Sequence, residues 1–257
     1  MLDIKDIAKY YDNSQYVSPR HILREYLQYK ILDLFVDSKI GNKISFLGGT
    51  CIRIVHNSFR FSEDLDFDNF NLSYDEFIEA SETIKRGLSL EGFDVEIRNV
   101  KKGAYHCYIR FPELLYKNKL TPLLSEKILI QIDTLSHGFE YRPETFLLNK
   151  FGVLRNILVT PPDILLSQKI YALFNRKRPK GRDFFDVVFL LGFTKPNYEY
   201  LDYRLKIKKA QDLKEYILGN IQYIDLKTLA KDVAPFLLKS GDVRKVEMFR
   251  EVIEKSL

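Results

Sequence analysis

Two glycines and a threonine, Gly48-Gly49-Thr50, form a turn whose backbone could hold phosphate oxygens. They follow the apolar segment 44–47, which is typical of a strand, and they precede a short segment with helical spacing. Glycine lets a backbone approach a ligand closely, and the free N–H groups at the start of a helix attract anions. The stretch lacks the lysine and the spacing of a Walker loop, and a double glycine after a strand is also a common structural turn.

Two aspartates, Asp64 and Asp66, stand two positions apart among apolar residues. On a strand they would face the same side, because side chains alternate, and their carboxylates could share a divalent metal ion. Asp133 ends the cleanest predicted strand, 127–133, and could add a third carboxylate. Three carboxylates suit two magnesium ions that bridge substrate phosphates and activate an attacking oxygen. The alternative is a pair of solvated aspartates at a strand end.

Ser62 and Arg60, which precede the two aspartates in the sequence, could contact the phosphates of a substrate. Ser62 could donate a hydrogen bond to a phosphate oxygen, and Arg60 could neutralise one. Asp68 has the same parity as Asp64 and Asp66, but the asparagines around it indicate a solvated loop.

A lysine and two aspartates in the second half of the chain form another candidate group. Lys169 lies in the apolar helical pattern 163–175, where it could extend to solvent or reach a triphosphate. Asp183 and Asp186 are three residues apart, so they share one face of the next predicted helix. They could pair with Lys169, or they could simply favour the positive end of the helix dipole.

The elements that must position these residues change in character near residue 160. Helical spacing predicts helices over 2–11, 19–37, 50–56 and 73–90, whereas alternation predicts strands over 43–47, 61–67, 93–100, 105–111 and 127–133, with one or two irregular strands between 145 and 159. Helices are expected after that, over 163–175, 183–191, 209–218, 226–238 and 243–256. We therefore expect an α+β protein, with a mixed-sheet core and N-terminal helices in residues 1–160 and a helical C-terminal domain, 161–257, that contributes to the active-site cleft.

Composition excludes several other classes of protein. Hydrophobic residues make up 46% of the chain, which suffices for a globular core, and the net charge of +5 is far below that of a nucleic-acid coat protein. The basic excess gathers in segment 176–182, which has five basic residues in seven and could guide RNA or be a solvated loop.

Cysteine and histidine usage argues against disulfide-rich and zinc proteins. The two cysteines, Cys51 and Cys107, match no zinc spacing, and the four histidines show no paired spacing. The first residues lack the pattern of a signal peptide, and no apolar run approaches the length of a membrane span. We expect a cytoplasmic protein with no membrane partner.

The motifs resemble those of a known family. The string Gly48-Gly49-Thr50-x-x-Arg53, followed by Arg60-Phe61-Ser62-Glu63-Asp64-Leu65-Asp66-Phe67, closely resembles the AbiEii/AbiGii toxin family of the nucleotidyltransferase superfamily. The later lysine and the string Arg182-Asp183-x-x-Asp186 resemble that family too. The resemblance covers roughly residues 44–191, with a departure at Cys51-Ile52, where small residues or leucine are usual.

The resemblance implies a polymerase-beta-like minimal nucleotidyltransferase fold, with a helical domain that closes over the nucleotide. It implies that the glycine turn holds the triphosphate, that Asp64 and Asp66 bind magnesium, and that Lys169 completes the site with Asp183 or Asp186. Members act as toxins of type IV-like toxin–antitoxin pairs used in phage defence, so a separately encoded antitoxin is an expected partner. Some relatives transfer nucleotides to the acceptor end of tRNA.

Together these features predict a nucleotidyltransferase dependent on Mg²⁺ or Mn²⁺, which moves a nucleoside monophosphate from an NTP to an acceptor hydroxyl, such as the 3′ end of tRNA or of another RNA. Asp133 would bind a metal ion or take the acceptor proton, while Gly48, Gly49, Thr50, Arg60, Ser62 and Lys169 would bind the nucleotide. Two alternatives are a catalytically weak toxin that sequesters nucleotides and a two-metal nuclease.

Overall fold

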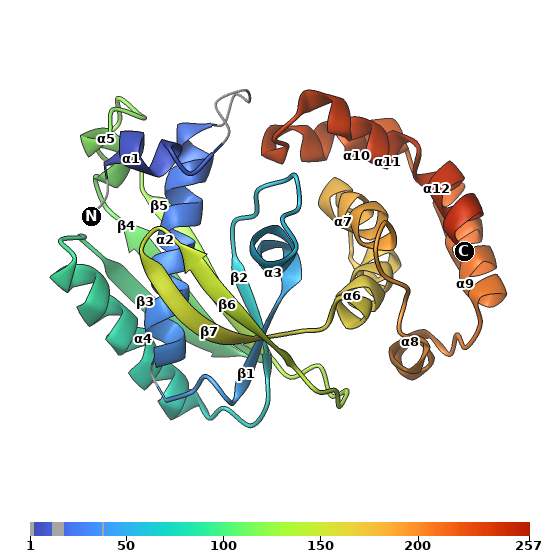
Figure 1. Cartoon of the computed structure of the whole chain (residues 1–257), viewed down its shortest axis with the longest axis horizontal. Coiled ribbons are helices and arrows are strands. Elements are labelled where there is room, and N and C mark those ends of the chain that lie inside the picture. The colour runs from blue at the N-terminus through green and yellow to red at the C-terminus, as the bar shows by residue number, and fades with distance from the viewer. Residues whose placement is uncertain (1–2, 12–17, 38) are drawn as a thin grey trace. The chain divides into compact units, whose positions relative to one another are not determined.

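The computed structural model describes residues 3–11, 18–37 and 39–257, which form two compact units (Figure 1). The sheet unit comprises residues 1–51, 61–138 and 143–159. The helical unit comprises residues 52–60, 139–142 and 160–257. The helical unit therefore takes in two short segments from the first half of the chain in addition to the C-terminal part.

The sheet unit is built on a seven-stranded mixed sheet in the order β3-β4-β5-β2-β1-β7-β6. The strands are β1 (Ile44–Leu47), β2 (Leu65–Asn69), β3 (Glu96–Lys102), β4 (Ala104–Phe111), β5 (Ile128–Leu135), β6 (Glu144–Lys150) and β7 (Val153–Val159). Strands β2 and β5 run parallel, as do β1 and β7, whereas the other neighbouring strands are antiparallel. The predicted α+β class with a mixed sheet is confirmed.

Helices cover one face of this sheet. Helix α2 (Pro19–Asp37) and helix α4 (Tyr74–Leu90) lie against it in Figure 1, and the short helices α1 (Ile4–Ala8) and α5 (Leu114–Lys117) belong to the same unit. Helix α3 (Gly48–Val55) is divided, since its residues up to Cys51 belong to the sheet unit and the rest to the helical unit. The side chains of Cys107, Ile109, Ile130 and Ile132 are fully buried on this face. Because side chains alternate along a strand, the residues between them project from the opposite face.

Helix α4 begins where the sequence predicts. The hydroxyl of Ser73 accepts a hydrogen bond from the backbone N–H of Glu76, and the Glu76 carboxylate accepts one from the backbone N–H of Ser73. This capping box satisfies two backbone donors that the first turn of the helix leaves without partners.

The helical unit consists of α6 (Pro162–Asn175), α7 (Gly181–Leu191), α8 (Tyr198–Leu205), α9 (Ala210–Ile221), α10 (Leu226–Val233), α11 (Arg244–Glu247) and α12 (Phe249–Ser256), with 3₁₀ turns at Ala234–Phe236 and Ser240–Val243. Gly181 lets α7 approach α10 closely, since a Cβ atom at this position would lie 1.9 Å from the carbonyl oxygen of Leu229. The apolar face of α7 packs inward, and the rings of Phe184 and Phe249 lie 4.8 Å apart at their centroids.

The predicted strand over residues 61–67 is wrong at its start, because β2 begins only at Leu65. Side chains of neighbouring elements bind the carbonyl groups of the preceding segment: the Gln28 amide donates to those of Ser62 and Glu63, and the Thr50 hydroxyl donates to that of Asp64. Helices α5 and α8 were not predicted. None of the described helices is both long and apolar enough to cross a membrane.

Candidate active site

The glycine turn brings the backbone against an aspartate carboxylate. Helix α3 (Gly48–Val55) starts directly after β1, and Gly48 adopts a left-handed backbone with φ of +79°. A Cβ atom on Gly48 would lie 2.2 Å from Oδ2 of Asp66 and 2.9 Å from its Cβ. Only glycine allows both this backbone conformation and this approach.

The rest of the turn is buried and fixes the segment before β2. Gly49 and Thr50 are buried, and the Thr50 hydroxyl lies 2.5 Å from the Asp64 carbonyl oxygen. This bond orients the backbone at Asp64, which directly precedes β2. Ser62, which is half-buried, lies in the same segment.

Asp66 and Asp133 occupy directly opposite positions on the parallel strands β2 and β5. Both side chains are half-buried. Since neighbouring strands lie about 4.8 Å apart, two side chains on one face at opposite positions come close enough to share a cation. Asp64, two residues before Asp66, adds a third carboxylate at the entry to β2.

Asp133 is held by two side chains that the sequence analysis did not single out. Its Oδ1 lies 2.6 Å from Nδ1 of His106, and it accepts a hydrogen bond of 2.7 Å from Nε2 of Gln131. His106 stands directly opposite Asp133 on β4. Strand alternation puts Gln131 on the same face as Asp133, whereas the place of His106 depends on the register between β4 and β5.

The helical unit brings the other predicted residues together. Nζ of Lys169 lies 2.9 Å from Asp183 and 2.8 Å from Asp186. The guanidinium of Arg60 donates to both carboxylate oxygens of Asp186, from Nε at 2.6 Å and from Nη2 at 2.5 Å. Arg60 and Asp186 are almost completely buried. The predicted phosphate contact of Arg60 stays a prediction; the contact that the structure shows is this two-pronged pair.

Electrostatics keep Lys169 and Asp183 charged. Burial lowers the pKa of Lys169, but the charges of Asp183 and Asp186 outweigh this effect, so its pKa lies above the ordinary value. Burial likewise raises the pKa of Asp183, but the charges of Lys169 and Arg176 reverse the shift and hold that pKa below its ordinary value. Lys169 is therefore a fixed cation and not a lysine that extends freely to solvent.

The expectation for Asp68 is wrong. It lies on β2 instead of in a solvated loop, is 2% exposed, and accepts a hydrogen bond of 2.9 Å from the backbone N–H of His137. Asn69 is the last residue of the strand, which ends two residues later than expected, and Asn71 follows it.

Among the described residues, no three His, Cys, Asp or Glu side chains already form a metal-binding cluster. Carboxylate oxygens are the ligands that hard cations prefer, and Asp66 and Asp133 stand at opposite positions of β2 and β5, with Asp64 directly before β2. The metal site stays a prediction.

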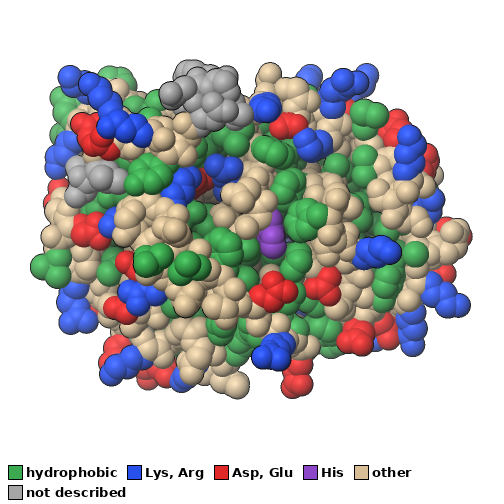
Figure 2. Space-filling model, viewed as in Figure 1, with side chains coloured by type: hydrophobic (Ala, Val, Ile, Leu, Met, Phe, Trp, Pro, Cys, Tyr) green, Lys and Arg blue, Asp and Glu red, His purple; other side chains and the backbone are tan. Residues whose placement is uncertain are grey.

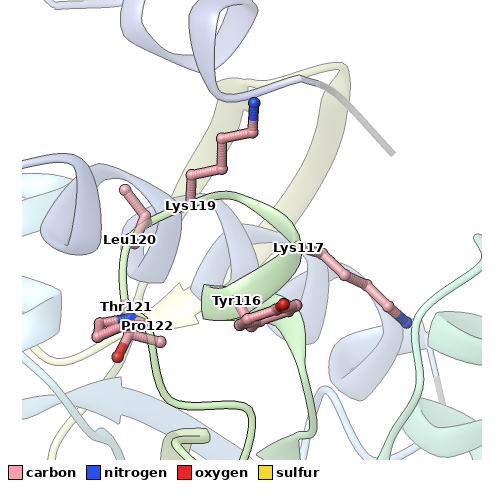
Figure 3. A pocket seen from close by; sticks show the side chains of 6 residues that line it. All are labelled: Tyr116, Lys117, Lys119, Leu120, Thr121 and Pro122. Carbon is pink, nitrogen blue, oxygen red and sulfur yellow. The ribbon is translucent and has the colours of Figure 1, made fainter.

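Two surface hollows are separate from these residues. One, of about 650 Å³, lies beside α5 and is lined by Tyr116, Lys117, Lys119, Leu120, Thr121 and Pro122 (Figure 3). The other, of about 610 Å³, lies in the helical unit and has Phe193, Pro196 and Tyr198 in its wall. Neither contains a predicted site residue. On the face shown in Figure 2, basic and acidic side chains are interspersed, in keeping with the modest net charge.

Comparisons with known proteins identify the family of this chain and proteins of similar fold. A protein family described as nucleotidyl transferase AbiEii toxin, type IV TA system, matches residues 30–252. The crystal structure of JHP933 from Helicobacter pylori is similar to this chain, with a TM-score of 0.56, 18% sequence identity, and coverage of 93% of this chain and 94% of that one. A candidate nucleotidyltransferase from H. pylori has a TM-score of 0.55 and 18% identity, with coverage of 93% and 96%. No curated protein matches the sequence.

Proposed function

Because the chain belongs to the AbiEii family of nucleotidyltransferase toxins from type IV toxin–antitoxin systems, we propose that it transfers a nucleoside monophosphate from an NTP to an acceptor hydroxyl. The observation that carries the proposal is the arrangement at Gly48, where the backbone reaches the carboxylate of Asp66 and Asp66 stands opposite Asp133. A turn that can approach a phosphate lies there beside oxygen ligands for a cation.

In the proposed reaction the acceptor oxygen forms a bond to the α-phosphorus of the NTP. The bond between that phosphorus and the bridging oxygen breaks, and pyrophosphate leaves with the electron pair. Asp133 takes the proton of the acceptor hydroxyl, a role for which His106 and Gln131 orient its carboxylate. Positioning and charge neutralisation supply most of the catalysis in reactions of this kind.

Asp64 and Asp66 would hold Mg²⁺ or Mn²⁺, which would neutralise phosphate charge and lower the pKa of the attacking hydroxyl. Metal binding by Asp133 is the alternative to its role as the base. Gly48, Gly49 and Ser62 would bind phosphate oxygens. The buried hydroxyl of Thr50 would fix the backbone at Asp64 in addition to its predicted nucleotide contact.

In the helical unit, Lys169 is proposed to contact the triphosphate as a point charge. Its two carboxylate neighbours keep it protonated and restrict its position. Asp186 is in turn held by Arg60. Family membership also suggests an antitoxin partner. Co-expression of the adjacent gene would test this, since an antitoxin should restore the growth of cells that produce the chain.

The proposal is tested by incubating the purified chain with α-labelled NTPs, Mg²⁺ and total tRNA. Label that enters RNA of greater length, and that requires Asp66, would support transfer. Shortened RNA would instead indicate a nuclease. Bound nucleotide without any transfer to RNA or protein, together with growth arrest that survives Asp66→Ala, would indicate sequestration.

A further inference from the structure

The sheet face that carries Asp66 and Asp133 continues across β5, β4 and β3 as a patch of aromatic and basic side chains. We define the β3–β5 surface as Arg98, His106, Tyr108, Arg110, Leu129 and Gln131. The strand register places Tyr108 directly opposite both Arg98 and Gln131, and it places Arg110 opposite Leu129. Leu129 and Gln131 share the face of Asp133 because side chains alternate along β5. The three residues of β4 stand opposite positions on that face of β5, and Arg98 on β3 stands opposite Tyr108.

This surface is accessible to solvent. The residues that alternate with it on β4 and β5, such as Cys107, Ile109 and Ile130, are completely buried under the helices. By contrast, Arg98 and Leu129 are exposed, and the other four residues are half-buried. The sheet therefore presents an apolar face to its helices and a mixed aromatic and polar face to solvent.

The aromatic and basic groups are arranged in a way that suits unpaired bases. The rings of His106 and Tyr108 are 6.4 Å apart at their centroids and inclined by only 29°, so they form two neighbouring flat platforms. In residues 3–11, 18–37 and 39–257, no acidic side chain forms an ion pair with Arg98 or Arg110. Rings on an open sheet stack bases, and nearby guanidinium groups bind phosphates or stack on bases in turn.

The β3–β5 surface ends beside Asp133, the proposed base. Within the β3–β5 surface, the ring of His106 lies beside that of Tyr108, and its Nδ1 contacts the carboxylate of Asp133. From Arg110 to His106 the strand rises about 13 Å, at roughly 3.3 Å per residue, which is enough for two or three stacked bases. A nucleic-acid strand whose last nucleotide lay beside His106 would bring its terminal hydroxyl to Asp133.

We propose that the β3–β5 surface binds the acceptor and that the acceptor is the single-stranded 3′ end of an RNA. Tyr108 and His106 stack on the last bases, while Arg98 and Arg110 bind the phosphates behind them. The inference rests on the proposed function for its identification of the bound strand as an acceptor. It adds the location of the acceptor site and assigns four residues to it.

Direct binding tests this inference without any nucleotide transfer. The affinity of the full chain for a fluorescently labelled single-stranded RNA would be measured by anisotropy, in the absence of NTP, for Tyr108→Ala and Arg98→Ala. The matched controls are Tyr116→Ala on α5 and Arg86→Ala on α4, since both residues are exposed and lie in the same unit away from this surface. Circular dichroism would verify that each variant is folded.

Tyr108→Ala should weaken binding at least about fivefold, the effect of losing one stacked base. Arg98→Ala should reduce the slope of log K against log salt by about 0.7, the contribution of one phosphate contact on a single strand. The two control variants should bind as the wild type does. Equal affinity for RNA in Tyr108→Ala and in wild type would overturn the inference.

The outcomes also separate this inference from the proposed function. RNA binding that depends on Tyr108 in a chain that transfers no nucleotide would support the surface and count against the function. Transfer to RNA that is unchanged in Tyr108→Ala, or label that enters protein alone, would support transfer chemistry and overturn the assignment of this surface to an RNA acceptor.

Discussion

Replacing Gly48 with alanine should disrupt the candidate site by displacing the carboxylate of Asp66. The left-handed backbone at Gly48 disfavours any side chain by about 1–2 kcal/mol. The new methyl group would in addition collide with Asp66, 2.2 Å from its Oδ2 and 2.9 Å from its Cβ, and relief of such overpacking costs about 1–3 kcal/mol. The total loss of unfolding free energy should therefore be about 2–5 kcal/mol.

A second glycine isolates the collision from the backbone effect. Gly103, in the turn between β3 and β4, also has a positive φ, of +70°, but a Cβ atom there would meet no atom of the residues that the structure describes within 4 Å. Gly103→Ala should lose only the backbone part, about 1–2 kcal/mol, and should leave the site intact. Urea denaturation would measure both variants, and their difference should be about 1–3 kcal/mol.

The same pair of variants tests the role of Asp66 in transfer. A shift of about 1 Å in a reacting group can lower the rate about 10²-fold, so Gly48→Ala should lose at least that much label transfer to RNA. Gly103→Ala should keep the wild-type rate. Equal stability losses in the two variants, or full transfer by Gly48→Ala, would refute the link between the glycine turn and the carboxylate.

Three further predictions concern the helical unit and its ion pairs. Gly181→Ala should lower the unfolding free energy by about 1–3 kcal/mol, because its Cβ would strike a backbone carbonyl of α10 at 1.9 Å. Gly219→Ala in α9, where a Cβ atom would have no atom of the described residues within 4 Å, should raise the unfolding free energy by about 0.5–1 kcal/mol. Urea unfolding measures both. Arg60→Met breaks the buried ion pair with Asp186 and should lower the unfolding free energy by about 3 kcal/mol. Arg20→Met breaks the exposed ion pair with Glu126 and should lower it by less than about 1 kcal/mol in the same assay. Because neighbouring positive charges outweigh burial and hold the pKa of Asp183 below its ordinary 3.8, its contribution to stability is complete above about pH 4 and is lost as pH falls through the lowered pKa. The stability difference between wild type and Asp183→Asn should therefore shrink between pH 7 and pH 3 in urea titrations, and a difference independent of pH would contradict this reasoning.

Much of the fold follows from local patterns. Helix α2 has the predicted bounds, Pro19–Asp37, and the alternation of Ile128, Ile130 and Ile132 gives the buried face of β5 correctly. The local sequence pattern gave a wrong prediction for segment 61–64, whose apolar residues are spaced as in a strand. Its carbonyl groups are bound by side chains distant in the sequence, such as Gln28, and no local signal reveals those partners.

In the candidate site, too, local patterns could be predicted from the sequence, whereas contacts between distant residues could not. The spacing of Gly48 and Asp66 was visible in the sequence, and the structure adds the close approach that requires glycine. The partners of charged residues were harder to predict, since Arg60 and Asp186 are 126 residues apart and their pairing depends on the tertiary fold. His106 was missed because its contact with Asp133 depends on the register of two antiparallel strands.

The central claim is that this chain transfers nucleotides by means of the carboxylate of Asp66. The most direct measurement is the incorporation of an α-labelled NTP into RNA, with Mg²⁺, by wild type, Asp66→Asn and Asp75→Asn, the last being an exposed aspartate on α4. We predict that wild type and Asp75→Asn incorporate label and release pyrophosphate in equal amounts, while Asp66→Asn does neither. Undiminished incorporation by Asp66→Asn, or no incorporation by a folded wild type that binds both NTP and RNA, would contradict the claim.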